Sequence, residues 1–169
     1  MDIQIRKGNL QDTEGYIRLL AEIKAGMNNQ DWFFLDPPEE IRAFMENGTM
    51  ELWVAMDGER MAGGFDILHP GLKSINYGYD LGFSERQLLR VVQMDTAAVA
   101  ADYRGLGLQK KLMETAEAEI RKESGRILLS TVHPDNVYSM NNLLKQGYTV
   151  AKTVAKYGSV RNVLRKDLP

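Results

Sequence analysis

The chain has 169 residues, no cysteine and a formal net charge of −2. This length fits one compact domain, residues 1–169, that can bury roughly 70% of its unfolded surface. The absence of cysteine excludes disulfides, thiolate metal sites and a cysteine nucleophile, and the near-neutral charge gives no reason to expect a nucleic acid or an anionic membrane as partner. Because no apolar run approaches ~20 residues, we expect a cytoplasmic protein. We also expect no bound metal.

Hydrophobic periodicity and turn residues predict strands and helices along most of the chain. The Asp57-Gly58 dipeptide predicts a hairpin turn, and Gly147 stands where a left-handed helix end is expected. The stretch 69–86 has no clear period. The predicted elements are a strand over 2–7, a helix from Asn9 capped by Asn9 or Asp12, a helix over 39–46, strands over 51–56, 61–68 and 88–99, a helix over 108–122, a strand over 127–132, a helix over 136–146, and strands over 150–156 and 161–166. This order predicts one mixed α/β domain.

Residues 102–113, which read DYRGLGLQKKLM, combine two glycines with the start of a helix that lacks a capping side chain. Gly105 and Gly107 precede the helix, and Lys110 and Lys111 fill its first turn. The first amides of a helix lack internal acceptors and carry the positive end of the dipole, so a phosphate can bind them where glycine allows close approach. The alternative is a glycine turn whose amides are hydrated. A dinucleotide fingerprint would need glycine or alanine at Lys110, and a Walker loop would need Gly-Lys-Ser/Thr, which the chain lacks.

Residues 99–109, VAADYRGLGLQ, resemble the signature of the GNAT superfamily of N-acyltransferases. The order of predicted elements over 2–166 resembles that family's fold, and Asn136 to Tyr148 resembles its later helix that ends in Gly-aromatic. The resemblance implies an α/β fold with a mixed, mostly antiparallel sheet of about seven strands, flanked by about four helices and splayed between the fourth and fifth strands. It also implies an N-acetyltransferase that moves an acetyl group from acetyl-CoA to a primary amine by direct attack in a ternary complex.

The same resemblance implies a coenzyme A site on this loop and on the strand before it. The pantetheine arm would run along Ala97, Ala98 and Val99 and would contact Asn136, and the amide of Val99 would polarise the thioester carbonyl. Gln109 departs from the usual final glycine or alanine, which a backbone contact tolerates if the side chain points outward. The pyrophosphate would accept from the amides of Arg104, Gly105, Leu106, Gly107, Leu108 and Gln109.

A second departure concerns the proton for the leaving group. Leu143 stands where many family members carry a tyrosine that protonates the departing thiolate. Water, Tyr138 or His133 is an alternative donor, although Tyr138 lies about 140° around a helix from Leu143. This departure motivates the alternative function, a non-catalytic acyl-CoA-binding or regulatory module on the same fold. A purely structural domain with a hydrated glycine turn would bind no coenzyme A.

Asp95 is the first candidate for the base. It interrupts an apolar strand four residues before Val99 and could take the proton of the attacking amine, often through a water. The alternative is a carboxylate that is satisfied by hydrogen bonds or faces solvent. Because a charge in a buried strand is unfavourable without a partner, we expect Asp95 to have a specific role either way. His133 is a second catalytic candidate, against the alternative of a surface-turn histidine.

The sequence leaves the acceptor open as a small-molecule or peptide amine. Trp32, Phe33 and Phe34 either line an acceptor pocket or pack in the core. The acidic residues within 31–40 either attract a cationic amine or form a solvated loop. The resemblance also allows a homodimer.

Overall fold

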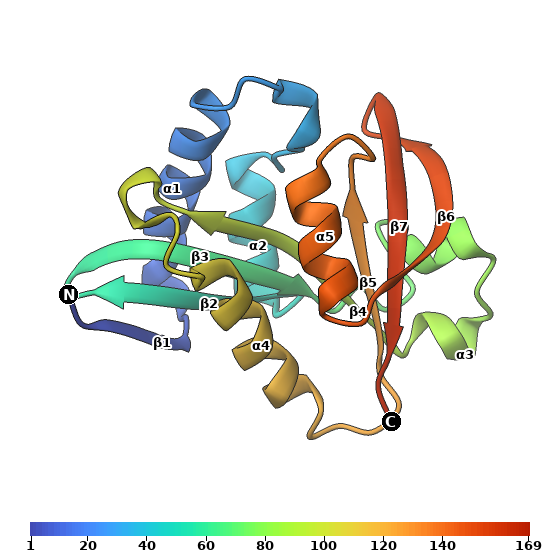
Figure 1. The fold of residues 1–169 in the computed structure, drawn as a ribbon. Helices are drawn as coiled ribbons and strands as arrows, with labels where there is room; N and C mark the ends of the chain where they lie inside the picture. Colours follow the sequence, from blue (N-terminus) through green and yellow to red (C-terminus); the bar gives the residue numbers. More distant parts are fainter. The chain divides into compact units, whose positions relative to one another are not determined.

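The computed structural model describes residues 1–169, which divide into two compact units. The first unit comprises Met1–Leu68 and Thr96–Glu119, and the second comprises His69–Asp95 and Ile120–Pro169. The strands are β1 (Ile3–Lys7), β2 (Met50–Asp57), β3 (Arg60–Leu68), β4 (Val91–Val99), β5 (Ile127–Val132), β6 (Thr149–Lys156) and β7 (Ser159–Asp167) (Figure 1). The α-helices are α1 (Thr13–Ala25), α2 (Pro38–Asn47), α3 (Glu85–Leu88), α4 (Leu108–Ile120) and α5 (Val137–Lys145). Short 3-10 helices are η1 (Leu10–Asp12), η2 (Gln30–Trp32), η3 (Tyr77–Leu81) and η4 (Ala101–Tyr103).

The seven strands follow the order β1-β2-β3-β4-β5-β7-β6, and β4 contributes to both units. The pairs β1–β2, β2–β3, β5–β7 and β6–β7 are antiparallel, whereas β4 and β5 are parallel. This arrangement confirms the expected mixed, mostly antiparallel sheet. The β4–β5 register runs from Val91–Ile127 to Gln93–Leu129, and next to it Ser130 Oγ donates to the Met94 carbonyl at 2.9 Å. Beyond Gln93 and Leu129, where the two strands were expected to diverge, a side-chain hydrogen bond therefore takes the place of backbone pairing.

The stretch 69–86 differs from its expected irregular form because it contains η3 and the first half of α3. Asn76 caps η3 by accepting from the amide two residues further on, at 2.8 Å. Ser84 caps α3 as part of a capping box. Helices this short have no hydrophobic period, so only their caps could have indicated them. Since α3 ends at Leu88, β4 begins at Val91, later than expected.

In the first unit, α1 and α4 cover opposite faces of β3 (Figure 1). A Cβ on Gly63 would lie 3.4 Å from Leu112 of α4, and a Cβ on Gly64 would lie 2.6 Å from the ring of Tyr16 of α1. Successive strand residues point to opposite faces, so these two contacts assign each helix to its face. Glycine at 64 allows the fully buried Tyr16 to lie directly on the strand.

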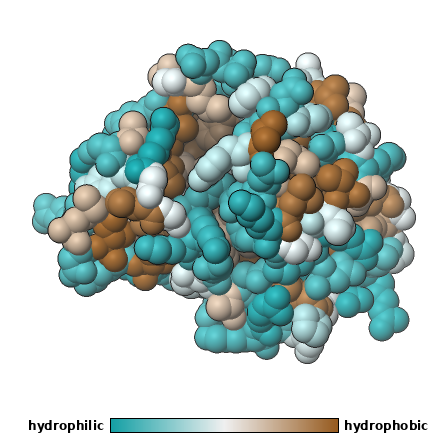
Figure 2. Space-filling view, in the orientation of Figure 1, coloured by the Kyte–Doolittle hydropathy of each residue, from teal (hydrophilic) through white to brown (hydrophobic).

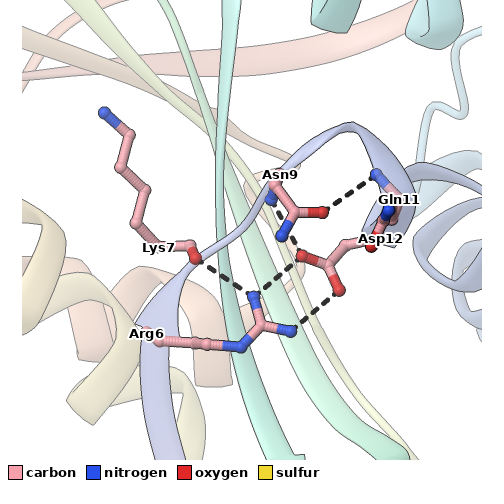
Figure 3. A network of polar contacts seen from close by, with 5 residues as sticks. All are labelled: Arg6, Lys7, Asn9, Gln11 and Asp12. Carbon is pink, nitrogen blue, oxygen red and sulfur yellow. Dashed lines mark hydrogen bonds and ion pairs between the residues drawn. The ribbon is translucent and has the colours of Figure 1, made fainter.

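A polar network holds the connection from β1 to α1 (Figure 3). Asn9 Oδ1 accepts from the Gln11 amide at 2.9 Å, and the Asn9 amide donates to Asp12 Oδ2 at 2.8 Å. Arg6 donates to both oxygens of Asp12, at 2.8 and 2.9 Å. These Arg6 hydrogen bonds lower the pKa of Asp12. The helical segment therefore begins after Asn9, as predicted, and both expected capping residues take part.

Replacing Asp12 by asparagine is expected to lower the free energy of unfolding by about 0.5–1 kcal/mol near pH 7, because the bidentate ion pair with Arg6 is lost. The pKa of Asp12 is lower in the folded chain than its reference value of 3.8, so its contribution is present above about pH 4 and is lost as the pH falls through the folded value. Urea unfolding between pH 7 and pH 2.5 should show the wild-type and variant stabilities converging at low pH. Asp2→Asn, an exposed carboxylate nearby, is the control, and a pH-independent difference at Asp12 would contradict this account.

In the second unit, η3 and α5 cover opposite faces of β7. Tyr77 of η3 packs against Val163, whereas the neighbouring Asn162 donates to Met140 Sδ of α5 at 3.7 Å. The core on the η3 side contains Tyr77, Val91, Ile127, Leu129 and Val163. At the end of α5, Gly147 has φ of +95°, which confirms the predicted left-handed helix end.

The surface carries its hydrophobic residues in separate groups. Figure 2 shows one face covered mainly by hydrophilic residues, with brown hydrophobic ones scattered among them. None of the helices is both long and apolar enough for a membrane span.

Candidate functional site

The glycine turn between η4 and α4 presents backbone amides next to open space. Gly105 and Gly107 have φ of +83° and +72°, and a Cβ on either would meet nothing within 4 Å. The first backbone hydrogen bond of α4 runs from the Lys111 amide to the Gly107 carbonyl at 3.1 Å. The amides of residues 108–110, which precede it, have no acceptor within the helix. The turn therefore has the backbone, the free amides and the space that an anion needs.

Side chains of η4 anchor this turn to the β2–β3 hairpin. Tyr103 is buried, and its hydroxyl donates to Asp57 Oδ2 at 2.6 Å. Arg60 donates to both oxygens of Asp102, at 2.6 and 2.9 Å, and its guanidinium lies 5.0 Å from the centroid of the Tyr103 ring. The hydrogen bond to Asp57 raises the pKa of Tyr103, so the phenol remains a donor. Sequence reasoning missed this anchor, which joins residues 42 and 46 positions apart.

The end of β4 directs the Val99 amide away from β3. The Ala100 amide donates to the Ala62 carbonyl at 2.9 Å, so it points toward β3. Backbone groups alternate in direction along a strand, and the Val99 amide therefore points to the other side. Ala98 is buried, whereas Ala97 and Val99 are half-buried. The segment thus offers a peptide edge lined by small side chains.

A buried tyrosine and a buried carboxylate hold the backbone of β4 just before this edge. The Tyr16 hydroxyl donates to Asp66 Oδ2 at 2.5 Å and lies 3.2 Å from the Thr96 carbonyl oxygen. Both side chains are almost fully buried. Asp66 is a single carboxylate inside an apolar strand, which is the pattern that singled out Asp95. The sequence therefore indicated Asp66 too, although it was not among the candidates.

Asp95 has a specific partner in the second unit. Its Oδ1 accepts from the Tyr77 hydroxyl at 2.9 Å, and the Tyr77 hydroxyl oxygen lies 2.8 Å from that of Tyr157. Burial, and then the nearby Asp95 charge, raise the pKa of Tyr77 well above its usual value. Tyr77 therefore remains a neutral phenol that donates to the carboxylate. This contact supplies the partner that a carboxylate in a strand needs, and it is compatible with either proposed role of Asp95.

Tyr157 was not singled out from the sequence. It is the only residue other than glycine with a positive φ, +57°. Together with Gly158 it forms a two-residue turn between Lys156 and Ser159, in which both turn residues have positive φ. Such turns favour Asn-Gly or Asp-Gly, so a Tyr-Gly pair between two predicted strands was the available signal.

His133 and Asn136 both make local contacts at the start of α5. His133 Nδ1 accepts from the Asp135 amide at 3.1 Å. Asn136 Oδ1 accepts from the Ser139 amide at 3.3 Å and so caps the helix. These are the turn and capping roles weighed as alternatives from the sequence. The side-chain nitrogen of Asn136 can still donate to a ligand.

The remaining candidate side chains differ in exposure. Leu143 is buried, whereas Tyr138 is 75% exposed. Trp32 and Phe33 are half-buried and Phe34 is exposed, so of the two alternatives weighed for these aromatic residues the structure does not support packing in the core. They lie in and next to η2, a short loop helix that lacks an apolar face of its own.

Comparison with known proteins identifies the same architecture. A family model described as the acetyltransferase (GNAT) family matches residues 20–148. A GNAT acetyltransferase from Streptococcus pneumoniae has a TM-score of 0.72 at 14% identity, covering 99% of this chain and 100% of that one. A Salmonella typhimurium protein solved with its cofactor acetyl-CoA has a TM-score of 0.73 at 14% identity, with coverage of 100% and 95%. A ribosomal-protein-alanine N-acetyltransferase from Brucella melitensis has a TM-score of 0.72 at 18% identity, with coverage of 98% and 99%. No curated protein sequence matches the chain significantly.

Proposed function

Because the chain belongs to the acetyltransferase (GNAT) family, we propose that it transfers an acetyl group from acetyl-CoA to a primary amine by direct attack in a ternary complex. The observation that carries the proposal is the glycine turn, where left-handed Gly105 and Gly107 precede first-turn amides that have no acceptor in the helix. In the family context, the anion suited to this turn is the pyrophosphate of coenzyme A.

The proposed coenzyme A site begins at the turn and continues along β4. Amides from Gly105 to Gln109 bind the pyrophosphate. The Arg104 amide, also expected to do so, already donates to the Ala101 carbonyl at 3.4 Å, because it closes the short helix η4. The pantetheine arm, which contains peptide-like amides, pairs with the backbone of Ala97 to Val99 as an added strand would. This backbone edge points away from β3, as the Ala100–Ala62 hydrogen bond indicates. The contact of Asn136 with the arm stays a prediction from the family resemblance.

The proposed chemistry uses one amide and one carboxylate. The amine nitrogen attacks the thioester carbon, and the Val99 amide stabilises the negative charge that develops on the carbonyl oxygen. Asp95 takes a proton from the nitrogen, directly or through a water. The C–S bond then breaks, and the electron pair leaves with sulfur as the thiolate of coenzyme A. His133 stays an alternative proton donor to the thiolate, because its contact with the Asp135 amide uses only Nδ1 and the imidazole has a second nitrogen, Nε2.

The alternative function is a non-catalytic acyl-CoA-binding or regulatory module. Leu143 favours it, because a buried aliphatic side chain at this position cannot protonate a thiolate. The thiolate is already a fair leaving group and can take its proton from water, so we place the enzyme first.

Two measurements test the proposal. Calorimetric titration should show acetyl-CoA binding with a dissociation constant between about 1 μM and 1 mM. A thiol-release assay with polyamines, amino acids, lysine peptides and peptide N-termini should then show turnover with at least one amine. Binding without turnover on any amine would favour the regulatory module, and no binding at millimolar acetyl-CoA would overturn both functions.

A further inference from the structure

A short chain of hydrogen bonds links Asp95 to the surface of the second unit. Asp95 Oδ1 accepts from Tyr77 at 2.9 Å, and the hydroxyl oxygens of Tyr77 and Tyr157 are 2.8 Å apart. Tyr77 is 3% exposed, whereas Tyr157 is 37% exposed. This series of hydrogen bonds therefore runs from a half-buried carboxylate, through a buried phenol, to a phenol in contact with solvent.

The hydrogen positions along this chain follow from counting donors. Each phenol has one proton to donate. The Tyr77 hydroxyl donates to Asp95 Oδ1, so its single proton is engaged there and Tyr157 is the donor in the contact between the two hydroxyls. The resting direction of donation is thus from Tyr157 to Tyr77 to Asp95.

The backbone of Tyr157 is strained in a way that a structural turn would not require. A positive φ is unfavourable for a bulky side chain, and asparagine or glycine would satisfy the same turn. Strained residues of this kind cluster at functional sites, where the side chain is needed at that place. Here the strain places the Tyr157 hydroxyl against Tyr77.

Two cations lie beside the phenols. Lys156 Nζ is 5.4 Å from the Tyr77 ring centroid and 5.7 Å from that of Tyr157, and it pairs with Asp80 at 2.9 Å. The buried Arg161 guanidinium lies 5.9 Å from the centroid of the Tyr157 ring. Their positive charge opposes retention of an excess proton on the two phenols. The titratable and charged groups around these hydrogen bonds include Asp95, Tyr77, Tyr157, Lys156, Asp80 and Arg161, and Thr131 adds a hydroxyl beside Tyr77.

We propose that Tyr77 and Tyr157 relay the proton that Asp95 takes from the attacking amine to solvent, an inference that rests on the proposed role of Asp95 as the base. Once protonated, Asp95 donates to Tyr77, and the two phenols turn to donate outward. The proton of Asp95 then moves to Tyr77, that of Tyr77 to Tyr157, and that of Tyr157 to water. One proton leaves, each group is restored, and the resting direction of donation returns.

Tyr157→Phe tests the relay, because it removes the hydroxyl while keeping the ring and the turn. We expect kcat to fall about tenfold, less than the roughly 10²–10⁴-fold loss expected when a general base is removed, because Asp95 stays in place, and the KM for acetyl-CoA should be unchanged. A small buffer base such as imidazole should restore kcat of the variant in proportion to its concentration and leave the wild type unaffected. A purely structural role of the hydroxyl would not produce this buffer dependence. Tyr79→Phe is the matched control, since Tyr79 also lies in η3 but donates to the Leu72 carbonyl.

Tyr157→Asn separates strain from chemistry. Asparagine tolerates the left-handed turn, so this variant should unfold at a higher temperature than Tyr157→Phe and yet show the same buffer-dependent loss of kcat. Wild-type kcat without buffer dependence in Tyr157→Phe would overturn the relay and leave the proposed function intact. A wild-type protein that binds acetyl-CoA but acetylates no amine would overturn the proposed function, and the relay with it.

Discussion

Gly107→Leu is expected to raise the dissociation constant of acetyl-CoA at least tenfold, which corresponds to about 1.4 kcal/mol of binding free energy. Gly107 has φ of +72°, and a residue with a Cβ favours negative φ, which would turn the neighbouring amides away from a common point. The leucine side chain would also enter the open space beside the amides, because a Cβ at position 107 meets no atom within 4 Å. Isothermal titration with acetyl-CoA measures the change directly.

Gly48→Leu provides the matched control for the backbone strain. Gly48 ends α2 with φ of +79°, and a Cβ there also meets nothing within 4 Å. Both variants should lose a similar amount of stability, about 1–2 kcal/mol. Only Gly107→Leu should lose acetyl-CoA affinity, and an equal loss of affinity in the two variants would show that the turn has no particular part in binding.

Asp95→Asn is expected to lower kcat by a factor of about 10²–10⁴, because the amide cannot accept the proton of the amine. The acetyl-CoA dissociation constant should be unchanged, since none of the proposed contacts to the cofactor involves the Asp95 side chain. Asparagine still offers an oxygen to the Tyr77 hydroxyl, so the fold around it should be preserved. Steady-state kinetics with the amine identified by the thiol-release assay measures the effect.

Asp167→Asn is the control for the loss of a carboxylate in the same unit. Asp167 pairs with Arg165 at 2.7 Å, and neither residue belongs to the hydrogen-bonded series of Asp95, Tyr77 and Tyr157. Its kcat should stay within about threefold of wild type, as expected when a partly exposed ion pair is lost. If Asp95→Asn also stays within this range, Asp95 is a structural carboxylate held by Tyr77, and the base must be sought elsewhere.

Patterns among neighbouring residues predicted most of the helices and strands. The strand β5 has the bounds expected from the sequence, and the β2–β3 hairpin turns at Asp57-Gly58, because side-chain alternation and turn chemistry act over a few neighbouring residues. The short helices η3 and α3 were missed, since their stability comes from caps and from packing rather than from a period. The chemistry of the loop aromatics Trp32 and Phe34 left open whether they pack in the core or line an acceptor pocket, and only the fold shows that they lie at or near the surface.

The candidate site divides in the same way. The glycine turn and the helix after it could be predicted, because the left-handed conformation of Gly105 and Gly107 and the missing cap are properties of adjacent residues. The partners of Asp95 could not, since Tyr157 is 80 residues from Tyr77 along the chain and meets it only when β6, β7 and η3 assemble. Periodicity and turn chemistry act between near neighbours and so determine the elements, the family signature and the anion-binding turn. Only packing brings distant hydroxyl and carboxyl groups within hydrogen-bonding distance, and it is therefore the tertiary structure that joins Asp95 to Tyr77 and Tyr157.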